Sequence, residues 1–220
     1  MFTATETQAQ MTSRTDPRQR PTSVDLPADA SAVTCITRAD IPVVAAAAAR
    51  LAQDDLVAGW LLPDPRHRLT ALRGCFALLL EHALQHGFVD RLAGERAVAI
   101  WLDRTRSLPT RPDLLRRLQQ MCGHDTDAAL LLADVTAHHA PPSPHLHLAL
   151  LAADTPADAA VLLAHRQQRL DRVGVAAFAY ASTQAQLEAL MDAGFQPSDA
   201  VRLPAGPPLW LTLRPVTRDP

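Results

Sequence analysis

The residues of this chain whose spacing first suggests chemistry are two histidines. His145 and His147 stand two positions apart in an apolar segment. On a β-strand such a pair shares one face, as a pair of zinc ligands can. No Cys or Glu at a supporting spacing completes a zinc site. The pair therefore fits a structural role better than a metal site, and we expect no bound metal.

Two absent residue types exclude several reactions. Lys and Asn are missing from all 220 residues, so each of the 21 basic residues is an arginine. Both absences fit a GC-rich gene. Without lysine there is no Schiff base and no phosphate-loop lysine, and without asparagine no Asn can serve as an oxyanion donor. None of the serines has the tight glycine-flanked turn of a nucleophile.

Composition and charge narrow the class of protein. Apolar residues make up 48% of the chain, enough for a substantial core, and the net charge is -2. A near-neutral chain argues against partners that need a basic surface, such as nucleic acid or an anionic membrane. Cys35, Cys75 and Cys122 are an odd number without a CxxC spacing, which argues against a disulfide framework. With no signal peptide and no apolar run of membrane length, we expect a cytoplasmic protein.

The pattern along the chain predicts a single α/β domain. Residues 1–30 are polar and Pro-rich and are expected to form a disordered tail, followed by the domain at 31–216. Strands are expected at 32–37, 88–92, 96–102, 145–152, 175–181, 195–203 and 208–214, and helices at 40–53, 65–86, 112–120, 125–138, 155–173 and 183–193. The segments at 88–92 and 96–102 form a hairpin. In it Val98, Ile100 and Leu102 should face one side of the sheet, with Ala97, Ala99 and Trp101 on the other. The apolar run at 145–152 suits a central strand, parallel to 175–181.

Several local sequences, in this order, carry a family likeness. They are TRADIPVVAAAAARL, GERAVAIWL, PHLHLALLAAD and GVAAFAYAS…LMDAGF, the last followed by LPAGPPLWLTLRP. Together they run from about Val33 to Pro215. Their order and spacing resemble those of the GNAT-type N-acetyltransferases, and most closely the branch around puromycin N-acetyltransferase. The resemblance implies a mixed central sheet flanked by helices.

The same resemblance implies acyl transfer from acetyl-CoA to a small-molecule amine. In the family, acyl-CoA lies across the splayed pair of parallel strands, and its pantetheine arm pairs with the edge of the central strand. Those positions correspond here to Leu150, Leu151 and Ala152. Gln186 would lie near the thioester or CoA. Arg166 and Arg169 could meet the 3′-phosphate, although surface helix charges are the simpler interpretation.

The phosphate-binding loop of the family is replaced here. Where the family has a glycine-containing loop whose amides hold the pyrophosphate, this chain has a shorter segment without glycine. Thr155 and Asp158 stand in the order of a capping box, with Pro156 at the first helical position. These side chains would satisfy the amides that a pyrophosphate needs, and Asp158 adds negative charge there. We therefore expect a weakened or lost pyrophosphate site.

The general acid of the family is also missing. The tyrosine that protonates the leaving thiolate aligns with Leu190, which has no proton to donate. Tyr180, the only tyrosine, is expected on a strand, where it either substitutes as the acid or packs as a half-buried aromatic ring. Two hypotheses follow. One is an N-acyltransferase of small amines, and the other is a degenerate, non-catalytic GNAT-like protein that binds a metabolite or a partner. The sequence does not indicate an oligomeric state.

Overall fold

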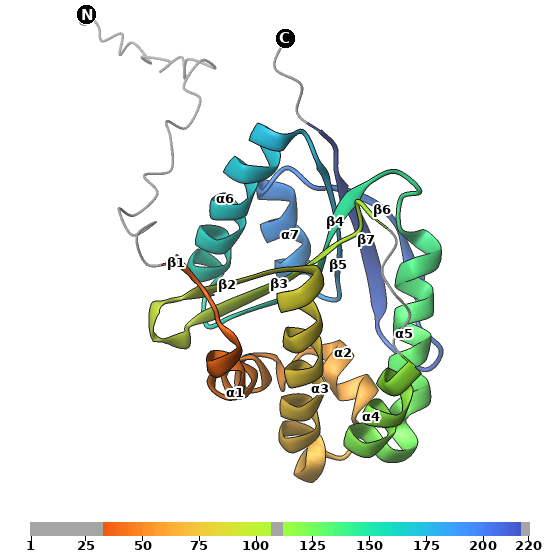
Figure 1. Cartoon of the computed structure of the whole chain (residues 1–220). Helices are drawn as coiled ribbons and strands as arrows, with labels where there is room; N and C mark the ends of the chain where they lie inside the picture. The colour runs from red at the N-terminus through yellow and green to blue at the C-terminus, as the bar shows by residue number, and fades with distance from the viewer. Residues whose placement is uncertain (1–32, 107–111, 217–220) are drawn as a thin grey trace, which may run out of the picture.

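The computed structural model describes residues 33–106 and 112–216 (Figure 1). The tail predicted at residues 1–30 lies outside this range. The described chain folds around one seven-stranded sheet with the strand order β1-β2-β3-β4-β5-β7-β6. Its strands are β1 (Val33–Cys35), β2 (Gly87–Leu92), β3 (Ala97–Asp103), β4 (His145–Ala153), β5 (Ala176–Ala181), β6 (Gln196–Arg202) and β7 (Pro208–Arg214). Only β4 and β5 are parallel, as the sequence predicted.

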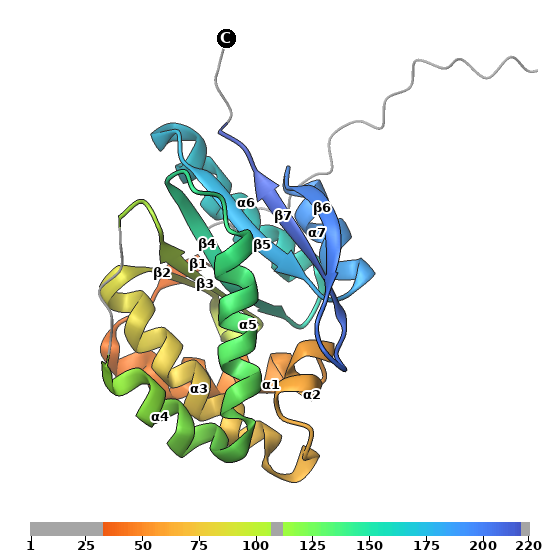
Figure 2. The same ribbon diagram turned by 90° about the vertical axis from the view of Figure 1, so that its right-hand side faces the viewer.

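Helices cover both faces of this sheet. The α-helices are α1 (Ile41–Ala52), α2 (Leu56–Leu61), α3 (Pro65–His86), α4 (Pro112–Cys122), α5 (Thr126–His139), α6 (Pro156–Val173) and α7 (Gln184–Asp192). Short 3₁₀ turns are η2 (Arg38–Asp40), η3 (Ala93–Glu95) and η4 (Gly123–Asp125). Figure 2 shows α3 and α4 side by side, with α5 next to them. Among the described helices, none is both long enough and apolar enough to cross a membrane.

The alternation predicted for β3 sets the two halves of the core. Ala97, Ala99 and Trp101 pack with the leucines of α6 and α7, as predicted for that face. The other face, with Val98, Ile100 and Leu102, packs against α1 and α3. All six of these β3 side chains are buried. The fold is therefore a single mixed α/β domain, and the predicted fold class is confirmed.

The order of the predicted elements is confirmed, and one helix was missed. Helix α2 has only six residues, one of which is Gly59, so it has too little periodicity to be recognised. Its start is nevertheless well formed, because the Asp55 side chain accepts a hydrogen bond from the amide of Val57 at 2.8 Å. Asp55, the residue just before this short helix, lies at the candidate site described below.

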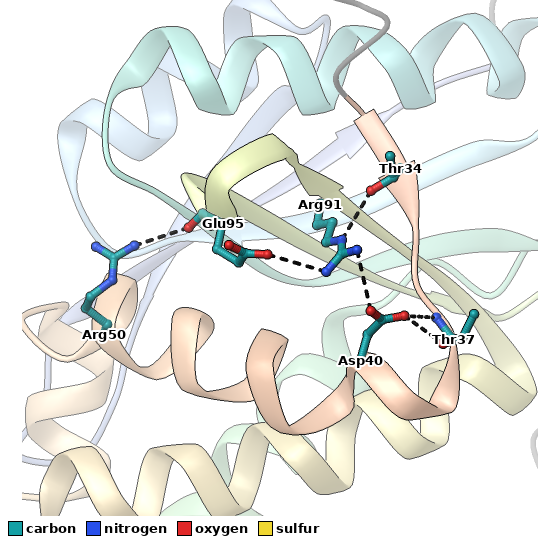
Figure 3. A network of polar contacts seen from close by, with 6 residues as sticks. All are labelled: Thr34, Thr37, Asp40, Arg50, Arg91 and Glu95. Atoms are coloured by element: carbon teal, nitrogen blue, oxygen red, sulfur yellow. Dashed lines mark hydrogen bonds and ion pairs between the residues drawn. The ribbon is translucent and has the colours of Figure 1, made fainter.

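A polar network ties the first elements to the β2–β3 turn (Figure 3). Arg91 of β2 donates to the Thr34 hydroxyl at 3.2 Å and lies 3.5 Å from a carboxylate oxygen of Asp40. Arg50 of α1 donates to the backbone oxygen of Glu95 at 3.1 Å. The network holds the end of α1 beside the turn that precedes β3. The same Arg50 side chain reaches the rim of the candidate site.

The expectation that Arg166 is a surface charge is wrong. Its side chain is buried and donates two hydrogen bonds to the buried carboxylate of Asp90 on β2, the Nε–Oδ2 bond being 2.9 Å long. The guanidinium also lies 4.6 Å from the centre of the Phe88 ring. Because a buried arginine keeps its charge, it needs a buried counter-ion, and Asp90 supplies it. Arg169, one helical turn later, is exposed as expected.

Candidate active site

Strand β4 leaves its parallel neighbour halfway along its length. Residues His145–Leu148 pair with Ala176–Ala179 of β5, and no residue of β5 pairs with the rest of β4. On its other edge β4 stays paired with β3 as far as Ala153. The two parallel strands therefore splay apart and leave one edge of β4 without a strand partner.

A β-bulge marks the point of divergence. Ile100 of β3 pairs with Leu150, but Trp101 pairs with Leu148, so Ala149 is the extra residue on β4. A bulge bends its strand and increases the local twist. Leu150, Leu151 and Ala152, the residues predicted to pair with pantetheine, follow directly after the bulge. Their backbone lies on the stretch of β4 that has no partner in β5.

A cavity of about 400 Å³ opens beside the splayed strands. Its size is in the usual range of small-molecule sites. Leu148–Pro156, Tyr180 and residues of α1, α2, α3, α4, α5 and α7 line it, most of them apolar. Its charged lining consists of the carboxylates Asp55, Asp125 and Asp154, with no Arg or His among the described lining residues. An apolar space with acidic groups favours a ligand that is apolar and cationic.

Among these carboxylates, Asp55 is held in place by side chains from across the cavity. Gln186 Nε2 donates to its Oδ2 at 2.7 Å, and the Ser182 hydroxyl lies 3.1 Å from the same oxygen. Gln186 is oriented in turn, because its Oε1 accepts from the Ser182 amide at 2.8 Å. No described cation forms a salt bridge with Asp55. The loop before α2, the end of β5 and helix α7 thus hold one negative charge on the cavity wall.

Tyr180 and Leu190 lie on the same cavity. Tyr180 follows Ala179, the last residue of β5 that pairs with β4. Burial, together with the negative charge of Asp55, raises the pKa of the Tyr180 phenol well above its usual value, so the hydroxyl stays protonated. No hydrogen bond joins that hydroxyl to another described residue. Leu190, at the family position of the acid, is buried.

The start of α6 has the cap that the sequence predicted. The Thr155 hydroxyl accepts a hydrogen bond from the amide of Asp158 at 3.1 Å and donates to the Asp158 carboxylate at 2.7 Å. Pro156 has no N–H to offer. Asp158 is buried and forms an ion pair with Arg96 at 3.1 Å, while Arg50 pairs with Asp154 at 2.9 Å. The Asp158 amide at this end of the helix is therefore occupied by the Thr155 cap.

The two histidines of β4 lie against the Phe178 ring of β5. His145 is buried, and its Nδ1 lies 2.8 Å from the backbone oxygen of Ser143. Burial, with Arg104 and His145 nearby, lowers the pKa of His147 to about 3, so its ring is neutral. Within residues 33–106 and 112–216, no group of three or more His, Cys, Asp or Glu could hold a metal ion.

Sequence reasoning missed two features of this site. Asp55 was not among the site residues predicted from the sequence. It is a cap, but Ser182 and Gln186 also bind it across the cavity. Cys75 and Cys122 are far apart in the sequence and were not predicted to meet. Their sulfurs lie 3.0 Å apart on the cavity wall.

Comparison with known proteins identifies this fold. No protein-family model and no curated protein sequence matches the chain. A solved structure of histone acetyltransferase HPA2 and related acetyltransferase from Corynebacterium glutamicum is similar, with 22% identity and a TM-score of 0.65. The match covers 85% of this chain and 97% of that one.

Two further solved structures have the same arrangement. A putative arylalkylamine N-acetyltransferase 7 of the mosquito Aedes aegypti is 16% identical with a TM-score of 0.51, covering 82% of this chain and 85% of that one. An apo mutant of agmatine N-acetyltransferase is 13% identical with a TM-score of 0.52, covering 83% and 98%. The chain therefore has the fold of the GNAT-type N-acetyltransferases. At these identities the likeness concerns the fold alone.

Proposed function

We propose that this protein is a GNAT-type N-acyltransferase that transfers an acyl group, such as acetyl, from acyl-CoA to a small-molecule amine. The observation that carries the proposal is the free edge of β4 at Leu150–Ala152, which opens on a cavity lined by Asp55 and Tyr180. The likeness of fold to N-acetyltransferases supports it. The narrower resemblance to the branch around puromycin N-acetyltransferase remains a prediction.

The residues present fit the pantetheine arm of CoA better than its pyrophosphate. A pantetheine arm has amide groups, and the backbone of β4 at Leu150–Ala152 has unpaired groups to meet them. The pyrophosphate finds a poorer partner at the start of α6. There Pro156 lacks an N–H, the amide of Asp158 is taken by Thr155, and the Asp158 carboxylate already holds Arg96 in an ion pair. CoA, when bound, supplies the acyl group as an activated thioester.

Asp55 would bind the acceptor. Its carboxylate attracts the ammonium form of an amine into a cavity with no described basic lining residue. The bonds from Gln186 and Ser182 hold it in place, so little side-chain entropy is lost when the amine binds. The amine must lose a proton to solvent before it attacks the acyl carbon.

Tyr180 would assist departure of the sulfur. Its hydroxyl is protonated and has no described partner, so it can donate a hydrogen bond to the developing thiolate. The raised pKa makes complete proton transfer from this phenol costly, and a thiolate is stable enough to leave without it. A charged hydrogen bond of this kind contributes about 1.5–3 kcal/mol. Tyr180→Phe should then lower kcat by about ten- to a hundredfold.

The cap of α6 favours a second candidate function. If the closed helix start excludes CoA, the protein is a non-catalytic GNAT-like binder whose cavity takes a cationic, largely apolar metabolite. The two candidate functions place the ligand in the same cavity. They differ in whether acetyl-CoA binds.

Calorimetry with acetyl-CoA separates the two candidates. The proposed enzyme binds acetyl-CoA with micromolar affinity and releases free thiol when a small amine is added. In Tyr180→Phe the affinity should stay unchanged while the rate of thiol release falls. No binding at millimolar acetyl-CoA would overturn the acyltransferase proposal and favour the non-catalytic metabolite-binding protein.

A further inference from the structure

Two cysteines that are far apart in the sequence face each other on the cavity wall. Cys75 lies on α3, Cys122 is the last residue of α4, and their sulfurs are 3.0 Å apart. Both are free thiols. A disulfide bond joins its sulfurs at about 2.05 Å, so the pair is in contact and unbonded.

The packing of α3 against α4 brings the sulfurs together. Gly74 has no side chain, and a Cβ built there would collide with the sulfur of Met121. Gly74 thus leaves room for the Met121 side chain of the facing helix. One turn or more away, Arg117 of α4 binds Glu81 of α3 through two hydrogen bonds of 2.7 and 3.0 Å. The Arg117–Glu81 pair helps to hold α4 against α3 near the cysteines.

The cavity offers these thiols a route to small reagents. Cys75 and Cys122 both line it, although Cys122 is only 8% exposed. The third cysteine, Cys35, is exposed on β1 and lies outside the cavity lining. A reagent must be small enough to enter a space of about 400 Å³ to reach the pair.

We propose that Cys75 and Cys122 form a dithiol site that a hydroperoxide converts reversibly to an intramolecular disulfide. In the first step the Cys122 thiolate attacks a peroxide oxygen, giving a sulfenic acid and, from hydrogen peroxide, hydroxide. In the second step the Cys75 thiolate attacks the Cys122 sulfur and displaces hydroxide. With protons, two thiols and one hydrogen peroxide give one disulfide and two waters. An external dithiol reverses the change by thiol–disulfide exchange.

The order of the steps follows from the contact between the sulfurs. With the Cys75 thiol as donor of the shared hydrogen bond, that bond lowers the pKa of Cys122 and raises the pKa of Cys75. Cys122 is then the first nucleophile and Cys75 the resolving thiol. The bond would link the end of α4 to α3 at the cavity wall. The site does not depend on acyl transfer or on CoA.

Peptide mapping under non-reducing conditions tests the proposal on the full chain. The variant Cys35→Ser, which lacks the exposed thiol, is treated with hydrogen peroxide and then alkylated in denaturant. Both remaining thiols should become unreactive, a peptide linked through Cys75 and Cys122 should appear, and dithiothreitol should restore both thiols. Thiols that stay fully alkylatable, or a Cys122 sulfinic acid without the link, would overturn the proposal.

A double variant is the matched control. Cys35→Ser with Cys75→Ser keeps Cys122 and removes the resolving thiol, at the cost of one sulfur atom. Peroxide should then give no linked peptide and oxidise Cys122 to sulfenic or sulfinic acid. Circular dichroism before treatment establishes that the fold is kept. Protection of Cys122 from oxidation in this variant would contradict the assigned order of steps.

Discussion

Gln186 donates a 2.7 Å hydrogen bond to Asp55 across 131 positions of sequence. The bond joins helix α7 to the cap of helix α2 at the wall of the cavity. The Ser182 hydroxyl binds the same carboxylate, so three elements determine its position. A carboxylate held in this way, with no described salt-bridge partner, can bind a cationic ligand that enters the cavity.

Asp55→Asn should weaken the binding of small apolar amines. Asn is a good N-cap, so α2 keeps its start, while the negative charge on the cavity wall is lost. We expect a loss of about tenfold or more in affinity for an amine such as phenethylamine, measured by calorimetry without CoA. The affinity for the neutral alcohol of the same shape should change little.

Asp54→Asn is the matched control for this charge. Asp54 is the adjacent residue, is exposed and does not line the cavity. Its substitution removes the same net charge and should leave amine binding unchanged. Equal losses in the two variants would show that overall charge, not Asp55, attracts the amine.

Thr155→Ala should affect both stability and CoA binding. Loss of an N-cap hydroxyl costs about 1 kcal/mol. The amide of Asp158 becomes free, so affinity for acetyl-CoA should rise. Thr183→Ala removes the equivalent cap from α7, where Thr183 accepts from the amide of Gln186 at 3.2 Å. It should cost similar stability without improving CoA binding, as thermal unfolding and calorimetry can measure.

Arg166→Met should destabilise the domain strongly. The substitution leaves the Asp90 carboxylate buried without its partner, and breaking a buried pair in this way costs about 3–5 kcal/mol. For a domain of this size, Tm should fall by roughly 10 °C. Arg169→Met, on the exposed side of the same helix, should lower Tm by no more than a degree or two. A similar Tm for both variants would mean that the ion pair contributes little.

Acid should destabilise the protein partly through His147. Its pKa is about 3 in the folded state and about 6.5 in the unfolded chain. Between these values the unfolded state binds more protons, so stability falls as pH drops below about 6.5, by at most about 1.4 kcal/mol per pH unit. His147→Gln should flatten the pH dependence measured by denaturant unfolding. His67→Gln, at a largely exposed ring, should leave it unchanged.

The sequence predictions were correct where the sequence pattern involves residues close together in the chain. The alternation Ala97 to Leu102 and the cap at Thr155 depend on residues within one strand or one helical turn. Helix α2 was missed because it is too short to show a period. Arg166 was assigned to the surface because arginine on a helix is usually exposed, and its partner lies 76 positions away.

The amino-acid sequence by itself determined the order of the elements, the parallel pairing of β4 with β5 and the Thr155 cap of α6. Each follows from side-chain periodicity, from caps or from connection length, which act over short distances along the chain. Only the tertiary structure decided that Asp55 meets Gln186 and that Cys75 meets Cys122. Those contacts depend on how closely helices and strands pack across the sheet, a property of the whole core that no local pattern contains.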